Sequence, residues 1–228
     1  MLNKFFSKII TVFKGEEWHF PEQLSGYYIL LIFFERIRMF IRGKIIFLFR
    51  KNICFIGYST IIKFKRLVVF GNNLSLGNNC FISPLSIEGI RLGKNVSIGN
   101  NTNIECSGSY KFLGKGLFVG NNTGLGTHGF YGCAGGVIIG NDVIIGNYVS
   151  FHSENHIYED IIIPIRLQGV SHIGIIVGNN CWIGAKATFL DGATVGNGCI
   201  VAAGAVVRGT FPDNCVIGGV PAKIIKYR

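Results

Sequence analysis

The side chains best suited to acid–base chemistry in this chain are histidines that lie where a regular sequence pattern is interrupted. His156 stands in the segment Ser153-Glu-Asn-His-Ile-Tyr-Glu159, with Glu154 and Glu159 close by in the sequence. An imidazole has an ordinary pKa of about 6.5, so at neutral pH it can accept a proton from a hydroxyl group. We therefore expect His156 to act as a general base, with the two glutamates near enough to orient its ring.

The other four histidines are weaker candidates. His152 directly follows Phe151, which is expected to point inward, and it could support His156 or simply be solvated. His128 lies in the glycine-rich segment 125–133 and could contact a substrate. His19 and His172 are expected to be ordinary structural or solvated residues.

A six-residue repeat must position these side chains. From residue 177 to residue 207 an aliphatic or aromatic residue recurs at every sixth position, and the residue four places after each of the first five is small. The large residues are Val177, Ile183, Phe189, Val195, Val201 and Val207, and the small ones are Cys181, Ala187, Ala193, Cys199 and Ala205. This period matches neither a helix nor an ordinary strand. It is typical of a chain wound into a three-sided prism, whose stacked coils share one core.

Earlier copies of the template begin at Leu76-Gly77 and continue through Ile145-Gly146. They predict an all-β domain, a parallel β-helix over residues 67–228, preceded by a helical and basic segment over residues 1–66. The repeats are interrupted at about 84–90, 106–118, 127–137 and 152–176. We expect these interruptions to be loops that leave one face of the prism, where binding sites tend to lie.

Charge and cysteine content indicate in which cellular compartment the protein acts and which partners it can bind. The net charge is +10, and residues 1–66 hold 12 basic and 4 acidic residues, so +8 belongs to that segment. The nearly neutral repeats argue against a nucleic-acid-binding surface. Of seven cysteines, Cys80, Cys181 and Cys199 occupy the small inward position, which favours buried, reduced thiols in a cytoplasmic protein. Residues 1–14 lack a small-residue cleavage site, so no secretory signal is expected.

Residues 27–51 mix apolar side chains with one glutamate and several cations. The uninterrupted apolar run 27–34 is too short to span a bilayer. The mixture suits a helix that lies on an anionic membrane surface, here the cytoplasmic face of the inner membrane. The alternative is a helix that caps the first coil of the prism or packs on another subunit.

Three stretches near the C-terminus resemble the hexapeptide-repeat acyltransferases, and most of all the galactoside and maltose acetyltransferases and the bacterial polysaccharide O-acetyltransferases. They are Val177-Gly-Asn-Asn-Cys-Trp-Ile-Gly-Ala-Lys-Ala-Thr188, Val195-Gly-Asn-Gly-Cys-Ile-Val-Ala-Ala-Gly-Ala-Val-Val207 and Ile217-Gly-Gly-Val-Pro-Ala-Lys-Ile-Ile225. The resemblance covers about residues 67–228. It implies a left-handed parallel β-helix, a homotrimer, and acetyl-CoA bound as co-substrate between neighbouring prisms, with no metal.

Carried over residue by residue, the resemblance makes His156 the catalytic base, 26 residues before Trp182. It also implies a set of residues along the bound CoA: Trp182, Ala185, Ala203, Arg208, Lys223 and Lys226, of which the two lysines would face the adenosine phosphates. Two features depart from the family. Ile157 replaces the proline that follows the catalytic histidine, and an asparagine that a neighbouring subunit places beside the acceptor has no clear match, segment 125–133 being the nearest.

The function implied is transfer of an acetyl group from acetyl-CoA to a sugar hydroxyl in surface polysaccharide biosynthesis. The runner-up within the same family is an N-acetyltransferase acting on a nucleotide-linked amino sugar. A zinc enzyme of the γ-carbonic anhydrase type would instead use His128, His152 and His156 as metal ligands. A non-catalytic scaffold would give no reason for a histidine in a loop.

Overall fold

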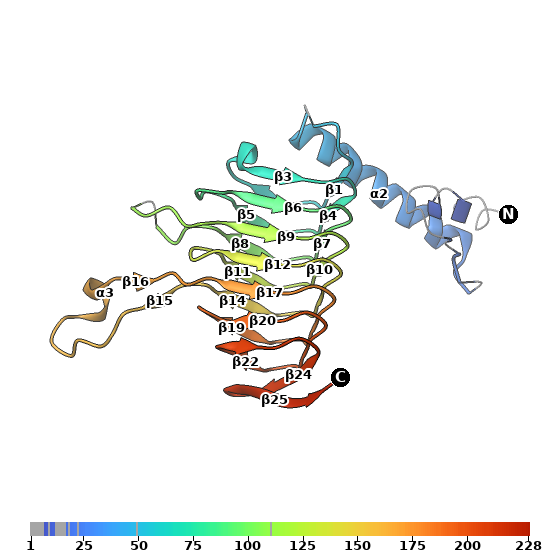
Figure 1. The fold of residues 1–228 in the computed structure, drawn as a ribbon. Helices are drawn as coiled ribbons and strands as arrows, with labels where there is room; N and C mark the ends of the chain where they lie inside the picture. The colour runs from blue at the N-terminus through green and yellow to red at the C-terminus, as the bar shows by residue number, and fades with distance from the viewer. Residues whose placement is uncertain are drawn as a thin grey trace.

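The computed structural model describes residues 7, 8, 10, 11, 17, 19–21, 23–48, 50–109 and 111–228. In this part of the chain a three-sided prism of stacked coils carries a long helix at its N-terminal end (Figure 1). Most of residues 1–14, for which no secretory signal was expected, lie outside the described residues. No helix among the described residues is long and apolar enough to cross a membrane.

Three sheets of parallel strands form the sides of the prism, which we call faces A, B and C. Face A contains β1 Cys54–Ile56, β4 Leu74–Leu76, β7 Ser97–Ile98, β10 Gly124–Leu125, β13 Ile144–Ile145, β18 Trp182–Ile183, β21 Ile200–Val201 and β24 Cys215–Gly219, with β25 Ala222–Tyr227 antiparallel to β24. Face B contains β2 Ile61–Ile62, β5 Phe81–Ser83, β8 Asn103–Glu105, β11 Phe130–Gly132, β14 Ser150–His152, β19 Thr188–Leu190 and β22 Val206–Val207. Face C contains β3 Val68–Phe70, β6 Ile90–Leu92, β9 Leu117–Val119, β12 Val137–Ile139, β17 Ile175–Val177, β20 Thr194–Val195 and β23 Thr210–Phe211. Neighbouring strands in a face belong to successive coils, so the expected all-β, left-handed parallel β-helix is confirmed.

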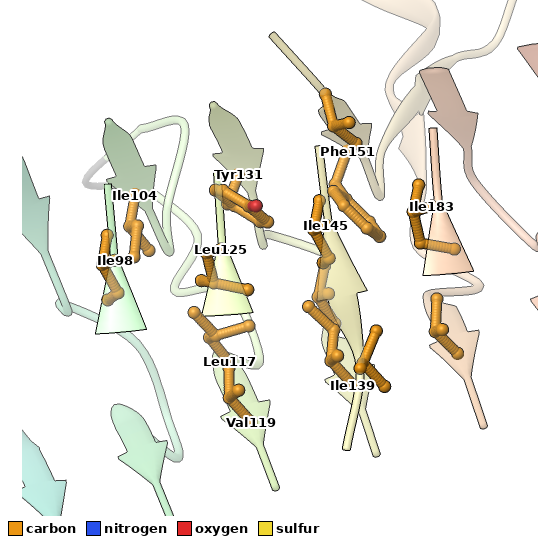
Figure 2. Packing of buried hydrophobic residues seen from close by; sticks show 14 of the residues in the cluster. Ile98, Ile104, Leu117, Val119, Leu125, Tyr131, Ile139, Ile145, Phe151 and Ile183 are labelled. Atoms are coloured by element: carbon orange, nitrogen blue, oxygen red, sulfur yellow. The ribbon is translucent and has the colours of Figure 1, made fainter. Parts of the chain in front are cut away.

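The core is a column of inward side chains, one layer per coil (Figure 2). All six large residues of the repeat from Val177 to Val207 are buried, and so are the five small ones between them. Aromatic rings form the centre of face B: Tyr131 stacks on Phe151 at 5.1 Å between ring centroids, and Phe151 stacks on Phe189 at 4.5 Å. The period of six is therefore the period of core packing.

The hydroxyl group of Tyr131 is a weak point in this column. It is buried and has no hydrogen-bond partner among the described residues, and burial raises the pKa of Tyr131 far above its ordinary value. An unpaired buried hydroxyl costs free energy that a phenyl ring does not. We expect Tyr131→Phe to raise the free energy of unfolding by about 1 kcal/mol in urea titrations. The matched change at the exposed Tyr158, Tyr158→Phe, should have almost no effect. A loss of stability in Tyr131→Phe would show that the hydroxyl has a partner, such as a buried water.

Two of the three corners are tight turns of constant length. Their third residue has a positive φ, a conformation that asparagine and glycine adopt at low cost. At the C–A corner these residues are Asn73, Asn95, Asn122, Asp142, Asn180, Gly198 and Asn214; at the A–B corner they are Ser59, Asn79, Asn101, His128, Tyr148, Lys186 and Gly204. Side-chain hydrogen bonds link the equivalent turns of successive coils; for example, Asn95 Nδ2 donates to Asn122 Oδ1 at 2.9 Å. We call such a column of linked turns a corner ladder.

The third corner, between faces B and C, carries all of the long insertions. They lie between β5 and β6, between β8 and β9, and between β14 and β17, as the interruptions at 84–90, 106–118 and 152–176 predicted. The predicted interruption at 127–137 is wrong, because β11 lies there in register with β8 and β14. Gly129 occupies the small inward position, and a Cβ there would come within 2.7 Å of the Tyr131 ring. The large ring thus fills the space that a small side chain fills in other coils.

The prism begins before residue 67, the boundary predicted from the sequence. Strands β1 and β2 belong to the first coil and pair in parallel with β4 and β5. Helix α2, Gly26–Ile46, packs on this coil through the buried residues Met39 and Gly43, and the ring of Phe47 lies 4.9 Å from that of Phe70. The end of the prism is therefore capped by the helical segment, one of the two alternatives for residues 27–51.

Candidate active site

The longest insertion forms an arm that stands out from the B–C corner (Figure 1). It runs from residue 153 to residue 174 between β14 and β17, and it contains β15 Asn155–His156, α3 Ile165–Gln168 and β16 Val170–Ser171. Strands β15 and β16 pair antiparallel, with Asn155 opposite Ser171 and His156 opposite Val170. His156 thus lies in the narrow neck of the arm, where its side chain is exposed and has no hydrogen-bond partner among the described residues.

A glutamate and a histidine close the base of this neck. Nε2 of His172 donates to Oε2 of Glu154 at 2.7 Å, and the two side chains are 31% and 34% exposed. The pairing of Asn155 with Ser171 places Glu154 and His172 opposite each other one step further along the neck. The expectation that Glu154 and Glu159 orient His156 is wrong, because Glu154 binds His172 and Glu159 accepts the backbone N–H of Tyr158 at 3.1 Å. His172, expected to be ordinary, is the histidine that a carboxylate holds.

The neck is also tied to the neighbouring coils. The buried carboxylate of Asp191 accepts hydrogen bonds from Ser171 Oγ at 3.1 Å and from the backbone N–H of Gly174 at 2.7 Å. Nζ of Lys115 donates to the backbone carbonyl of His172 at 3.3 Å. Because alternate residues of a strand point to the same side, Glu154 and His156 share one side of the neck. These contacts give His156 a fixed backbone while its imidazole stays open to a substrate.

His152 ends β14, immediately before the neck. Its ring packs on that of Phe130 at 5.5 Å between centroids. Burial lowers the pKa of His152, which favours the uncharged imidazole. His152 therefore shares the corner of His156, and among the described residues neither a hydrogen bond nor a ring contact links the two side chains.

His128 lies on a different corner. It takes the positive-φ position of an A–B turn, and its ring stacks on Tyr148 at 4.7 Å between centroids. Asn101 Nδ2 also donates to Nε2 of His128 at 3.0 Å. His128 is therefore part of the corner ladder between faces A and B. Within one chain it lies on a different corner from His156.

Most of the residues expected along the CoA gather on face A and its corner with face B. Trp182 is 56% exposed on the outer side of face A, between Ile144 and Ile200 of the adjacent coils. Ala185 and Ala203 are exposed at the A–B corner one coil apart, where the Gly204 N–H donates to the Ala185 carbonyl at 2.9 Å. The exposed Lys223 and Lys226 lie on β25, which extends the same face.

Arg208 is separated from that group. It follows β22 and is exposed at the B–C corner, the same edge of the prism from which the arm of His156 leaves. In a three-sided prism this corner is opposite face A, and the filled core lies between them. Within a single chain the candidate residues therefore form two groups. His156, His152 and Arg208 lie at the B–C corner, and the other residues expected along the CoA lie on face A and at the A–B corner.

No group of three or more histidine, cysteine, aspartate or glutamate side chains suited to a metal ion occurs among the residues that the structure describes. The three histidines that a zinc enzyme would need are split between the A–B and the B–C corners. All seven cysteines are free and buried. Cysteine burial thus matches the inward positions predicted for Cys80, Cys181 and Cys199.

Comparison with known families and proteins agrees with the repeat. Residues 174–209 match the family described as bacterial transferase hexapeptide (six repeats), and residues 73–106 match the hexapeptide repeat of succinyl-transferase. A probable acetyltransferase of Mycobacterium tuberculosis is 38% identical over 90 residues, 40% of this chain and 30% of the relative. The putative lipopolysaccharide biosynthesis O-acetyl transferase WbbJ of Escherichia coli is 39% identical over 97 residues, 40% of this chain and 50% of the relative. The chain thus spans half or less of the length of these curated relatives.

A solved structure shows the same fold. A mutant of AntD, an N-acyltransferase from Bacillus cereus in complex with dTDP-4-amino-4,6-dideoxyglucose and coenzyme A, has a TM-score of 0.51 and 16% sequence identity. The likeness covers 78% of this chain and 82% of that one. At this identity the likeness concerns the architecture of the prism alone.

Proposed function

We propose that this chain, which is built from the hexapeptide repeats of acetyltransferases, transfers an acetyl group from acetyl-CoA to a sugar hydroxyl in surface polysaccharide biosynthesis. The observation that supports it most is His156, whose imidazole has no hydrogen-bond partner among the described residues and lies in a fixed neck on a fold shared with acyltransferases. The relationship to a putative lipopolysaccharide O-acetyl transferase supports the choice of acceptor.

The reaction needs a base for the hydroxyl proton, hydrogen-bond donors for the oxyanion of the tetrahedral intermediate, and alignment of the two substrates. His156 would take the proton of the acceptor hydroxyl as its oxygen attacks the thioester carbonyl. The tetrahedral intermediate then collapses and expels the CoA thiolate. The imidazolium of His156 gives its proton to this thiolate, which leaves as free CoA. Lys223 and Lys226 would meet the phosphates of acetyl-CoA, and Trp182, Ala185 and Ala203 would line its pantetheine arm. Arg208 would contact the cofactor from the corner of His156.

The test of this function is release of free CoA thiol from acetyl-CoA in the presence of a panel of acceptors. We expect turnover with a saccharide hydroxyl acceptor, such as a sugar, a nucleotide sugar or a polyprenyl-linked glycan. Turnover only with a nucleotide-linked amino sugar would identify an N-acetyltransferase instead. No thiol release with any acceptor, together with hydration of CO₂ that depends on added zinc, would replace the proposal by the carbonic anhydrase alternative.

The active sites, on this proposal, lie between copies in a homotrimer. His156 and the face that carries Trp182 are on opposite sides of one prism, so a second copy must bring them together. Exposed apolar side chains on the outer side of face C, namely Phe118, Ile138 and Ile176, give that copy a surface to pack on.

Co-expression of two inactive variants tests the shared site. His156→Ala damages the arm and Trp182→Ala with Lys226→Ala damages face A. In randomly mixed trimers about a quarter of the sites then combine an intact arm with an intact face, and activity should return to about that fraction of wild type. Light scattering should give three chains per particle. A stable, active monomer, or mixed trimers as inactive as their parents, would contradict the shared site.

A further inference from the structure

Helix α2 carries a second apolar side that the prism does not use. We call it the α2 stripe: Tyr27, Leu31, Phe34, Ile41 and Ile45, with Arg38 in its middle. The spacing alternates between four and three residues, which places all six side chains on one side of the helix. The five apolar ones are between 47% and 66% exposed.

Capping of the prism does not explain this stripe. The side of α2 that contacts the first coil is formed by Met39 and Gly43 and continues into Phe47, all of them buried. A Cβ at Gly43 would come within 2.4 Å of the backbone oxygen of Cys54, so the helix and the coil are in close contact there. The stripe points away from that contact. A helix needed only as a cap would carry polar residues on its outer side.

The sequence that carries the stripe is strongly basic. Between residues 23 and 66 the only acidic residue is Glu35, whereas the basic residues are Arg36, Arg38, Arg42, Lys44, Arg50, Lys51, Lys63, Lys65 and Arg66. Some of them bind backbone carbonyls, as Arg42 does with Ile56 at 2.9 Å and Arg50 does with Val68 at 3.3 Å. Such bonds leave the positive charge in place. Arg38 on the stripe is exposed, so the outer side of α2 combines apolar side chains with positive charge in a strongly basic segment.

This combination distinguishes between two occupants. A second α2 helix packed on the stripe would bring a second Arg38 and a second set of cations into the same contact, and like charges would oppose it. An anionic lipid surface instead offers acyl chains to the apolar side chains and phosphates to the cations. Aromatic residues such as Tyr27 and Phe34 suit the boundary between the two, and a long arginine can extend to the headgroups.

We propose that the α2 stripe docks the protein on an anionic bilayer, with the helix lying in the plane of the lipid headgroups. The helix has 21 residues and would lie along about 32 Å of the surface. This docking does not depend on acetyl transfer, so each proposal can fail without the other.

Flotation with lipid vesicles tests the docking on the full-length protein. One vesicle preparation is phosphatidylcholine, and the other is phosphatidylcholine with about a third phosphatidylglycerol. We expect wild type to float with the anionic vesicles and to be released by added salt. Arg38→Gln should weaken partitioning about fivefold, the effect of one cation near such a surface. Ile41→Ser combined with Ile45→Ser should weaken it at least about tenfold, because two aliphatic side chains lose their apolar surroundings.

A matched control separates docking from a general loss of apolar surface. Ile87 is as exposed as the stripe residues but lies in the insertion between β5 and β6, and Ile87→Ser should float like wild type. Thiol release with a soluble acceptor should be the same for all three variants. Equal flotation with neutral vesicles would overturn the role of charge, and no flotation of wild type would overturn the proposal. A smaller particle for the Ile41→Ser and Ile45→Ser variant in light scattering would assign the stripe to contacts between copies.

Discussion

His156→Ala is expected to lower the rate of acetyl transfer by about 10²–10⁴-fold, the usual contribution of a general base. The affinity for acetyl-CoA should change little, because the residues expected to contact the cofactor lie mainly on face A. The side chain of His156 is exposed, so its removal leaves no cavity and the melting temperature should stay near that of wild type. Thiol release at saturating acetyl-CoA, with a thermal melt of each preparation, measures both quantities.

The other histidines serve as controls for this assignment. His128→Ala should have a small effect on turnover, because His128 belongs to a corner ladder away from the arm. His172→Ala and Glu154→Ala loosen the neck, and we expect an intermediate loss that the two variants share, because each breaks the same hydrogen bond. If His172→Ala is inactive while His156→Ala retains near-normal turnover, then the histidine paired with Glu154 is the base. If none of these histidines matters, the acetyltransferase proposal itself is contradicted.

Phe151→Ala is expected to lower the free energy of unfolding by about 3–5 kcal/mol, the range found for large aromatic residues removed from a core. Phe151 is fully buried between Tyr131 and Phe189, so the truncation leaves a cavity in the middle of the column and removes both stacking contacts. The measurement is urea unfolding followed by circular dichroism.

Phe112→Ala is the matched change at an exposed position, in the insertion between β8 and β9. It should alter the free energy of unfolding by less than about 0.5 kcal/mol. Since each coil contacts only its neighbours, the cavity should act mainly on the coils on either side of β14. A loss below about 1 kcal/mol for Phe151→Ala would mean that the neighbouring coils collapse into the space.

The repeated pattern predicted most of the fold because the same contact is made in every coil. Each large residue at a six-residue interval became a buried core residue, and the interruptions at 84–90, 106–118 and 152–176 became insertions at one corner. The pattern was misread where one side chain fills the space of another, as Tyr131 does beside Gly129. The first coil was missed although Ile56-Gly57, Thr60 and Ile62 repeat the template.

The surroundings of His156 could not be predicted from the sequence in the same way. Its position in an insertion was visible, but the partner of Glu154 depends on the pairing of β15 with β16 across an intervening loop. No short-range pattern in the sequence specifies which residue of the returning strand lies opposite Glu154. The assignment of roles to His156 and to the residues expected along the cofactor stays a prediction for the variants above to test.

The difference between the corners has a consequence for how such a chain can change length. At the two tight corners every turn has the same number of residues. One added residue there would shift the next strand by one position, so that its inward side chains would point outward. At the B–C corner the connections vary from a few residues to the whole arm, and the strands on either side still pair in register. Added or deleted residues are therefore absorbed at this one corner. The arm that bears His156 can be lengthened, shortened or exchanged while the face expected to hold the cofactor stays unaltered.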